Sequence, residues 1–130
     1  VVMAAAPSDY RPATVAAQKL KKSGGLRSIE LVENPDILAD TRSSRRDGAV
    51  VVGFALETND VLANARLKLS AKGLDLIVVN DATEVGAGFG VDTNRVTIIG
   101  RDGDERLPLL SKLEVADTIL DRIEALLDGR

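Results

Sequence analysis

Short apolar runs that alternate with helix-like segments constrain the fold of this chain more than any other feature of its sequence. Residues 50–56 and residues 76–79 are continuous apolar runs, which are typical of parallel strands buried on both faces. The segment between them is helix-like and carries Val61, Leu62, Ala65 and Leu69 on one face. This order predicts an α/β fold with a Rossmann-like, mostly parallel sheet and helices on both faces.

The N-terminal part of the sequence predicts a strand, an arm and a helix start. Residues 1–6 are typical of a buried strand, and because domains rarely begin inside a core strand we expect the chain to be the later part of a longer protein. Residues 9–25 are a long polar connection, which indicates a functional segment or an arm. Residues 26–33 alternate like a partly buried strand, and Asn34-Pro35-Asp36 predicts a helix start capped by Asn34.

The second half of the sequence carries clear start and stop signals. Asp47-Gly48 predicts a turn, and Asn59 or Asp60 is expected to open the helix that ends at Gly73. Asp102-Gly103 predicts a C-terminal hairpin between residues 95–101 and 105–110. A capping box then starts the final helix, and the residues that carry these signals are Ser111 and Glu114 for the box and Val115, Ala116, Ile119, Leu120, Ile123, Leu126 and Leu127 at helical spacing.

Composition excludes several classes of protein. The 130 residues suffice for one domain with a core, and the 45% hydrophobic content favours folding. The chain has neither Cys nor His, which removes thiol and imidazole nucleophiles, histidine bases and the usual zinc ligands. A net charge of -3 argues against a nucleic-acid partner. The sequence shows no membrane span and no secretory signal, so we expect no membrane partner and a cytoplasmic protein.

Polar side chains follow the expected strands, where an open α/β sheet places its ligand site. These strand-end loops begin with Ser8-Asp9, Asn34-Pro35, Glu57-Thr58 and Asn80-Asp81. The alternative is that they are only helix caps and turns, and for Asn34, Asn59 and Asp60 capping is a sufficient explanation. Gly86-x-Gly88-Phe89-Gly90 lacks the lysine and the following helix of a phosphate loop, so it is interpreted as a flexible loop.

Lysine residues could neutralise a polyphosphate. Lys19-x-Lys21-Lys22 lies in the long polar connection, and Lys68 and Lys72 lie one helical turn apart. Lysine binds phosphate as a point charge, although for any single lysine a solvated surface is the simpler explanation. From the residues alone, the chain is interpreted as an α/β domain that binds a nucleotide or a phosphate.

A series of ordered motifs closely resembles the phosphopantothenate–cysteine ligase family, over nearly the whole chain. The motifs are Ala4-Ala5-Ala6-Pro7-Ser8-Asp9-Tyr10-Arg11-Pro12, Lys19-Leu20-Lys21-Lys22, Glu30-Leu31-Val32-Glu33-Asn34-Pro35-Asp36-Ile37-Leu38, Val52-Gly53-Phe54-Ala55-Leu56-Glu57-Thr58-Asn59, residues 68–79 and Gly88-Phe89-Gly90-Val91-Asp92-Thr93-Asn94. The phrase from Gly53 to Asn59 and the Asn-Pro-Asp-Ile run are specific in combination.

The resemblance implies a two-step ligation in coenzyme A biosynthesis. CTP activates the carboxylate of 4'-phosphopantothenate as an acyl-cytidylate with release of pyrophosphate, and the amine of L-cysteine then displaces CMP. It also implies Mg²⁺, a homodimer formed through the extended arm, and fusion to or assembly with a phosphopantothenoylcysteine decarboxylase. FMN is expected only if such a decarboxylase domain is present elsewhere.

Site residues follow from the same resemblance. It implies that Lys19 is catalytic and that Asp9 is a ligand of Mg²⁺. The CTP-binding positions that match are Met3, Ala4, Ala5, Asp9, Lys19, Val32, Glu33, Asn34, Pro35, Phe54, Lys68 and Lys72. Phe54 is expected at a strand end, where a base could stack.

Two departures from the family qualify this interpretation. Pro7-Ser8 stands where the family usually has Val-Ala, and no Gly-Gly-Thr or Ile-Ser-Asn-x-Ser-Ser-Gly segment occurs in the chain. Residues 1–130 are therefore interpreted as the CTP-binding part of a ligase domain whose upstream part is missing, and activity of this part alone stays open. The alternative is a non-catalytic nucleotide-binding or dimerising α/β domain. An NAD-dependent oxidoreductase is disfavoured, because no Tyr-x-x-x-Lys pair and no Gly-x-Gly-x-x-Gly turn are present.

Overall fold

A five-stranded sheet forms the centre of the computed structural model, which describes residues 1–21, 24, 28–57, 60–81 and 90–129. The strand order is β1 (Val2–Met3), β4 (Val52–Glu57), β5 (Leu76–Asp81), β7 (Val96–Gly100) and β8 (Asp104–Arg106). Strands β1, β4 and β5 are parallel, β7 is antiparallel to β5, and β8 is antiparallel to β7. The predicted mostly parallel sheet is confirmed, because only β7 runs against the other strands of this sheet.

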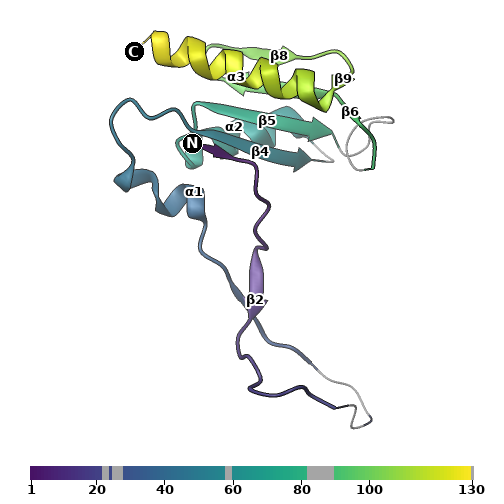
Figure 1. The fold of residues 1–130 in the computed structure, drawn as a ribbon. Helices are drawn as coiled ribbons and strands as arrows, with labels where there is room; N and C mark the ends of the chain where they lie inside the picture. Colours follow the sequence, from purple (N-terminus) through teal and green to yellow (C-terminus); the bar gives the residue numbers. More distant parts are fainter. Residues whose placement is uncertain (22–23, 25–27, 58–59, 82–89, 130) are drawn as a thin grey trace.

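Helices cover both faces of the sheet, as predicted (Figure 1). Helix α3 (Lys112–Asp128) buries Val115 and Ile119 against one face, together with Val52, Val78 and Ile98 of the strands. Helix α2 (Val61–Ala71) buries Ala65 against the other face. Because successive strand residues point to opposite faces, the continuous apolar runs supply both cores. None of the described helices is long and apolar enough to cross a membrane.

Strand β1 differs from the buried strand that the sequence predicted. It is two residues long and lies at the edge of the sheet, where Val1 is 72% exposed and Val2 is 49% exposed. An edge strand has one neighbour, and within the described residues nothing covers the outer side of β1, so apolar composition alone did not secure burial.

Both long helices bury a narrower stripe than their apolar residues suggested. In α2, Val61, Ala65 and Leu69 pack against the sheet, whereas Leu62 is 47% exposed. In α3, Ile123 and Leu126 continue the buried stripe, whereas Ala116, Leu120 and Leu127 are exposed. A helix lying on a flat sheet contacts it along one line, and side chains about 100° away from that line point to solvent.

Local signals at helix and strand ends are largely confirmed. Ser111 Oγ accepts from the Glu114 amide at 3.2 Å and Glu114 Oε2 accepts from the Ser111 amide at 2.8 Å, which completes the capping box. The hairpin of β7 and β8 turns at Asp102-Gly103, and the turn at Gly48 has a positive φ of 74°. At the start of α2, Asp60 occupies the cap position but its side chain makes no capping bond; Asn59 lies outside the described residues, as do residues 86–89 of the glycine-rich loop.

An extended arm projects away from the sheet (Figure 1). Its base is an antiparallel ribbon of β2 (Tyr10–Pro12) and β3 (Leu31–Glu33), continued by a bond from the Ala13 amide to the Glu30 carbonyl at 2.9 Å. The predicted strand over residues 26–33 is thus shorter, since residues 28–30 lie outside any strand and residues 26–27 are not described. The arm returns to the sheet through α1 (Ile37–Asp40) and a 3-10 turn, η1 (Arg42–Ser44). The remaining strands, β6 (Thr93–Asn94) and β9 (Leu110–Ser111), pair with each other.

Candidate functional site

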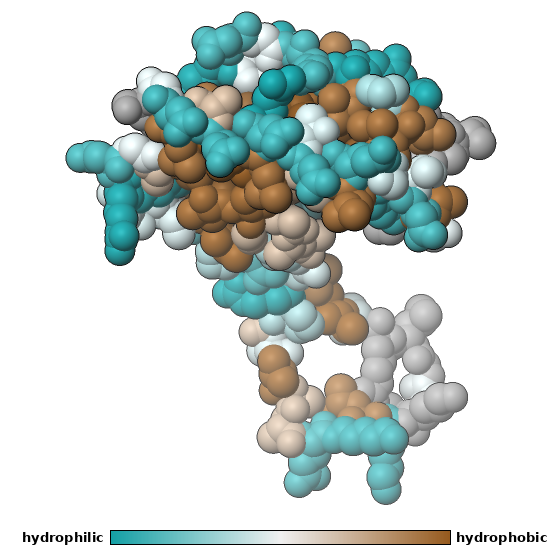
Figure 2. All heavy atoms as spheres, turned by 45° about the horizontal axis from the view of Figure 1, so that its top comes forward, coloured by the Kyte–Doolittle hydropathy of each residue, from teal (hydrophilic) through white to brown (hydrophobic). Residues whose placement is uncertain are grey.

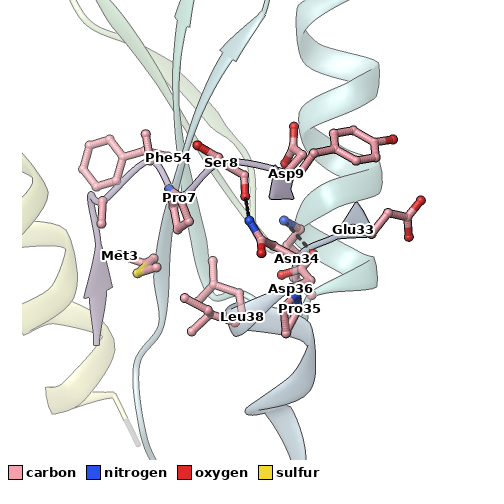
Figure 3. Close-up of a pocket in the computed structure, with 15 residues that line it drawn as sticks. Met3, Pro7, Ser8, Asp9, Glu33, Asn34, Pro35, Asp36, Leu38 and Phe54 are labelled. Atoms are coloured by element: carbon pink, nitrogen blue, oxygen red, sulfur yellow. Dashed lines mark hydrogen bonds and ion pairs between the residues drawn. The ribbon is translucent and has the colours of Figure 1, made fainter. Parts of the chain in front are cut away.

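A pocket of about 460 Å³ lies where β1 ends and the arm begins (Figure 3). Its walls come from the loop after β1, the base of the arm, the start of α1 and one residue each from β4 and the end of α2. The lining residues are Met3, Ala5, Ala6, Pro7, Ser8, Asp9, Tyr10, Glu33, Asn34, Pro35, Asp36, Ile37, Leu38, Phe54 and Lys72. The carboxyl end of a parallel strand is where an open α/β sheet places ligands, so the pocket has the expected location.

Asn34 ties together the two chain segments at the base of the arm. Its amide Nδ2 donates to the Ser8 carbonyl at 2.7 Å, and its Oδ1 accepts from Arg11 Nη1 at 2.9 Å. The Arg11 guanidinium also donates to the Glu33 carbonyl at 2.8 Å, and the Asn34 amide N–H donates to the Asp9 carbonyl at 2.8 Å. The prediction that Asn34 caps a helix was wrong, because its side chain is committed to the segment 26 residues away.

Asp36 is the residue that caps α1. Its Oδ1 accepts from the Ala39 amide at 3.1 Å, and its Oδ2 lies 2.9 Å from the Lys72 ammonium. The hydrogen bond from Lys72 lowers the pKa of the Asp36 carboxyl from its ordinary value; burial opposes this as the next-largest effect, and the bond from the Ala39 amide lowers the pKa by less. Asp36 therefore links the start of α1 to the end of α2.

Arg45 holds the ends of the same two helices together. Its guanidinium donates to the Gly73 carbonyl at 2.6 Å, to the Lys72 carbonyl at 3.0 Å and to the Leu38 carbonyl. Carbonyl groups in the last turn of a helix lack intrahelical partners, and a cation there also complements the helix dipole. Arg45 thereby fixes the backbone from which the Lys72 side chain reaches the pocket.

The pocket has an apolar side and a polar side (Figure 3). Met3, Pro7 and Phe54 lie together on the apolar side, Asp9, Asn34 and Asp36 lie on the polar side, and Ser8 and Leu38 lie between the two. Phe54 lies within β4 rather than at its end, which corrects the expectation from the sequence. It shares a face with Val52, which is fully buried, but lies two residues further along and is 39% exposed.

Most of the site residues expected from the sequence lie together in this pocket. Those that line it are Met3, Ala5, Asp9, Glu33, Asn34, Pro35, Phe54 and Lys72. Ala4, Lys19, Val32 and Lys68 do not line it. Lys19 lies on the exposed arm, and the Lys68 ammonium pairs with Glu57 Oε1 at 2.5 Å. The structure therefore brings Lys72, and not Lys68, to the pocket.

Several lining residues were not among the expected CTP-binding positions, namely Ala6, Pro7, Ser8, Tyr10, Asp36, Ile37 and Leu38, although Ser8 was expected as a strand-end polar residue. Most of them are direct neighbours of expected residues, so adjacency to the motifs was an available signal. Asp36 was noticed only as part of a helix start. Its pairing with Lys72 depends on how α1 and α2 meet, and local sequence carries no signal for that contact.

The donor set of the pocket fits a cation held jointly with a phosphate ligand. Mg²⁺ typically takes one or two carboxylates, several waters and phosphate oxygens rather than a full set of protein ligands. Asp9 offers one carboxylate in the pocket, and no cluster of three or more acidic, Cys or His ligands occurs within the described residues. Asp9 and an anionic ligand together would suit Mg²⁺, whereas the described residues by themselves offer no full set of metal ligands.

Fold and pocket define a Rossmann-like α/β domain with a ligand pocket at the carboxyl end of its parallel strands. A sequence model of the DNA/pantothenate metabolism flavoprotein C-terminal domain matches residues 1–127. The chain is 48% identical over 127 residues to the coenzyme A biosynthesis bifunctional protein CoaBC of Bacillus subtilis (strain 168), which covers 97% of this chain and 31% of that protein. The chain belongs to the DNA/pantothenate metabolism flavoprotein C-terminal domain family.

Solved structures agree with this assignment. The C-terminal domain of a CoaBC protein superposes with a TM-score of 0.74 at 35% identity, over 97% of this chain and 53% of that domain. A mutant of Cab2 in complex with phosphopantothenate-cysteine shares the fold, with a TM-score of 0.60 at 15% identity over 78% of this chain and 34% of that one. The chain spans about a third of the length of the curated relatives it matches.

Proposed function

We propose that this domain binds CTP and takes part in the CTP-dependent ligation of 4'-phosphopantothenate with L-cysteine. The observation that carries the proposal is the pocket itself, which gathers Met3, Asp9, Asn34, Phe54 and Lys72 from separate parts of the chain. These are positions that the family resemblance assigned to CTP. Relatives named as coenzyme A biosynthesis proteins support the pathway.

The two sides of the pocket suit the two parts of a nucleotide. The apolar side with Met3 and Phe54 offers a surface on which a base could stack. Lys72 offers a cation for the phosphates, and Asp9 offers a carboxylate for Mg²⁺, which would neutralise phosphate charge when bound. The Asn34 contacts with Ser8 and Arg11 hold the loop after β1 against the base of the arm, and the pocket lies between these two segments.

The proposed reaction requires that the reacting groups be held in position and that water be excluded from the site. The carboxylate of phosphopantothenate attacks the α-phosphate of CTP and pyrophosphate leaves; the amine of cysteine then attacks the acyl carbon, CMP leaves and the amine loses a proton. Holding the reacting groups together lowers the barrier of such reactions, and excluding water protects the mixed anhydride from hydrolysis. We assign Lys19 to the second step, as a cation carried by the arm.

Calorimetry with CTP, ATP and NAD, each with Mg²⁺, tests nucleotide choice directly. CTP should bind more tightly than ATP or NAD, because the three ligands differ in the base that the apolar side of the pocket would contact. Equal binding of CTP and ATP would contradict the proposed substrate. Mixing the chain with CTP, phosphopantothenate and cysteine then shows whether it makes product alone or only with further segments of a longer ligase.

The arm supports a homodimer as the second part of the proposal. It carries apolar side chains that a monomer leaves in water: Val15 is 90% exposed, Ile29 74% and Leu20 68%. Figure 2 shows such apolar residues on the projecting arm as well as on the sheet domain. Pairing with a second copy would bury them and would also account for a non-catalytic dimerising role. Sedimentation at increasing protein concentration should show a dimer, and a chain that stays monomeric would contradict the proposed homodimer.

Assembly with a decarboxylase belongs to the same proposal. Several matched relatives are named as bifunctional proteins, and a flavin-dependent partner domain would carry the FMN. A cytoplasmic location follows from the proposed pathway. Absorbance spectra of a purified longer form would show whether flavin is present.

A further inference from the structure

The Lys72 ammonium, which the proposed function assigns to the phosphates of the nucleotide, is paired with a carboxylate inside the pocket. Asp36 Oδ2 lies 2.9 Å from Lys72 Nζ, and both residues line the pocket. We infer that Asp36 is an internal counter-ion for Lys72, that an incoming phosphate exchanges with it, and that Asp36 thereby sets the affinity of this phosphate subsite. The inference rests on the proposed function only for the identity of the anion.

Both partners of this ion pair are anchored by other contacts. Asp36 Oδ1 accepts from the Ala39 amide while Oδ2 takes Lys72, so the cap holds the carboxylate in place. Arg45 holds the Lys72 carbonyl at 3.0 Å and also bonds to Gly73 and Leu38. The side chain of Lys72 is the part left to move, since its long stem carries three rotatable donors. Exchange therefore means that the ammonium turns from Asp36 to the phosphate, or is shared between them.

The charge balance of the pocket makes this exchange costly for an anion. Asp9, Glu33 and Asp36 line the pocket with carboxylates, and Lys72 is the one lysine or arginine among the described lining residues. A polyphosphate thus meets more negative than positive charge when no metal accompanies it. The side chains of Lys72 and Asp36 are 32% and 44% exposed, and pairs this exposed contribute little to stability. Removing the charge of Asp36 should therefore alter binding rather than folding.

The test uses the full chain and inorganic tripolyphosphate without divalent metal, measured by calorimetry. Asp36→Asn keeps the helix cap, because Asn caps as well as Asp, and removes the counter-ion. We expect it to bind tripolyphosphate about two- to fivefold more tightly than the parent chain, the range for a partly exposed charge contact. Asp36→Ser, which also retains a capping oxygen, repeats the test should the first variant fold poorly.

The matched control is Glu33→Gln, which removes a carboxylate of the same pocket whose side chain points outward (Figure 3). It should give a smaller gain, and that gain should be the same with Lys72→Gln in the background. The gain from Asp36→Asn should shrink by more than half in the Lys72→Gln background, because there is no ammonium to release.

Three outcomes overturn the inference. Asp36→Asn could bind tripolyphosphate more weakly than the parent chain, its gain in affinity could be no larger than that of Glu33→Gln, or its gain could be unchanged in the Lys72→Gln background. Absence of tripolyphosphate binding in both the parent chain and Asp36→Asn overturns it as well. Because tripolyphosphate carries no base, these results are independent of whether the pocket prefers CTP. A parent chain that binds CTP no better than ATP would remove the proposed substrate and leave this test intact.

Discussion

The side-chain amide of Asn34 donates a hydrogen bond to the main-chain carbonyl of Ser8 at 2.7 Å, across 26 residues of sequence. The same side chain accepts from Arg11, so one residue joins the strand-end loop to the returning end of the arm. The pocket lies between these two segments, and its shape depends on this contact.

Replacing Asn34 by Ala removes two side-chain hydrogen bonds, each worth on the order of 1 kcal/mol, and should weaken CTP binding by about five- to thirtyfold. The thermal midpoint should fall only slightly, because the site is exposed. Asn34→Asp is the control: it keeps the acceptor for Arg11 but cannot donate to Ser8, so its loss in calorimetry should be intermediate. Unchanged CTP affinity in both variants would show that the Asn34 contacts with Ser8 and Arg11 do not shape the site.

Lys19 should matter for catalysis and not for folding. In the shortest form of the protein that makes product, Lys19→Gln should lower turnover by about a hundredfold or more, the scale of losing one preorganised charge contact in a transition state. CTP affinity and the thermal midpoint should stay close to those of the parent, because Lys19 lies on the exposed arm outside the pocket. Mass spectrometry should detect accumulated acyl-cytidylate in the variant. Normal turnover of Lys19→Gln would mean that Lys19 is a solvated surface lysine without a catalytic role.

The two lysines of α2 should behave differently. Lys72→Gln removes the cation that lines the pocket and should weaken CTP binding by about five- to tenfold, as expected for a charged hydrogen bond at a partly exposed site. Lys68→Gln should weaken it less, because Lys68 lies outside the pocket and pairs with Glu57. Titrations of both variants under one salt concentration make the comparison. An equal or larger loss in Lys68→Gln would mean that the ligand extends beyond the pocket toward Glu57.

Ser111→Ala should destabilise the fold and leave CTP binding at the pocket unchanged. It removes the oxygen that accepts from the Glu114 amide and breaks the capping box of α3, which costs about 1 kcal/mol in comparable helices. Urea unfolding measures the loss, and Ser111→Thr, which keeps a hydroxyl, should recover most of it. CTP affinity should be the same in all three proteins.

Stability should depend on pH through Asp36. Its pKa is lower in the folded protein than in the unfolded chain, chiefly because Lys72 donates to it, so its contribution is present above the unfolded pKa and is lost as pH falls through the folded value. The difference in unfolding free energy between the parent and Asp36→Asn should be constant above about pH 5 and shrink below about pH 4. The difference is expected to stay below about 1 kcal/mol, because the pair is partly exposed. A difference that grows toward low pH would contradict the assignment.

The sequence by itself determined the central strands, the hairpin and the capping box of the last helix. Residues 50–56 and 76–79 are apolar without interruption, and such runs have few alternatives to burial in a two-faced sheet. The capping box joins Ser111 to Glu114, three residues away, so its geometry follows from the helix alone. Signals of this kind need no knowledge of the rest of the chain.

Only the tertiary structure decided which polar side chains meet at the pocket. Asn34 and Asp36 stand two residues apart and both suit a helix cap, yet Asp36 caps α1 while Asn34 binds Ser8. The difference arises because the arm returns beside the loop after β1, which brings a distant carbonyl within reach of Asn34. Lys72 reaches the pocket and Lys68 does not because Arg45 and Asp36 bind the end of α2 to α1. These contacts join segments that are far apart in the sequence, and no local pattern of residues shows that such segments meet in the folded chain.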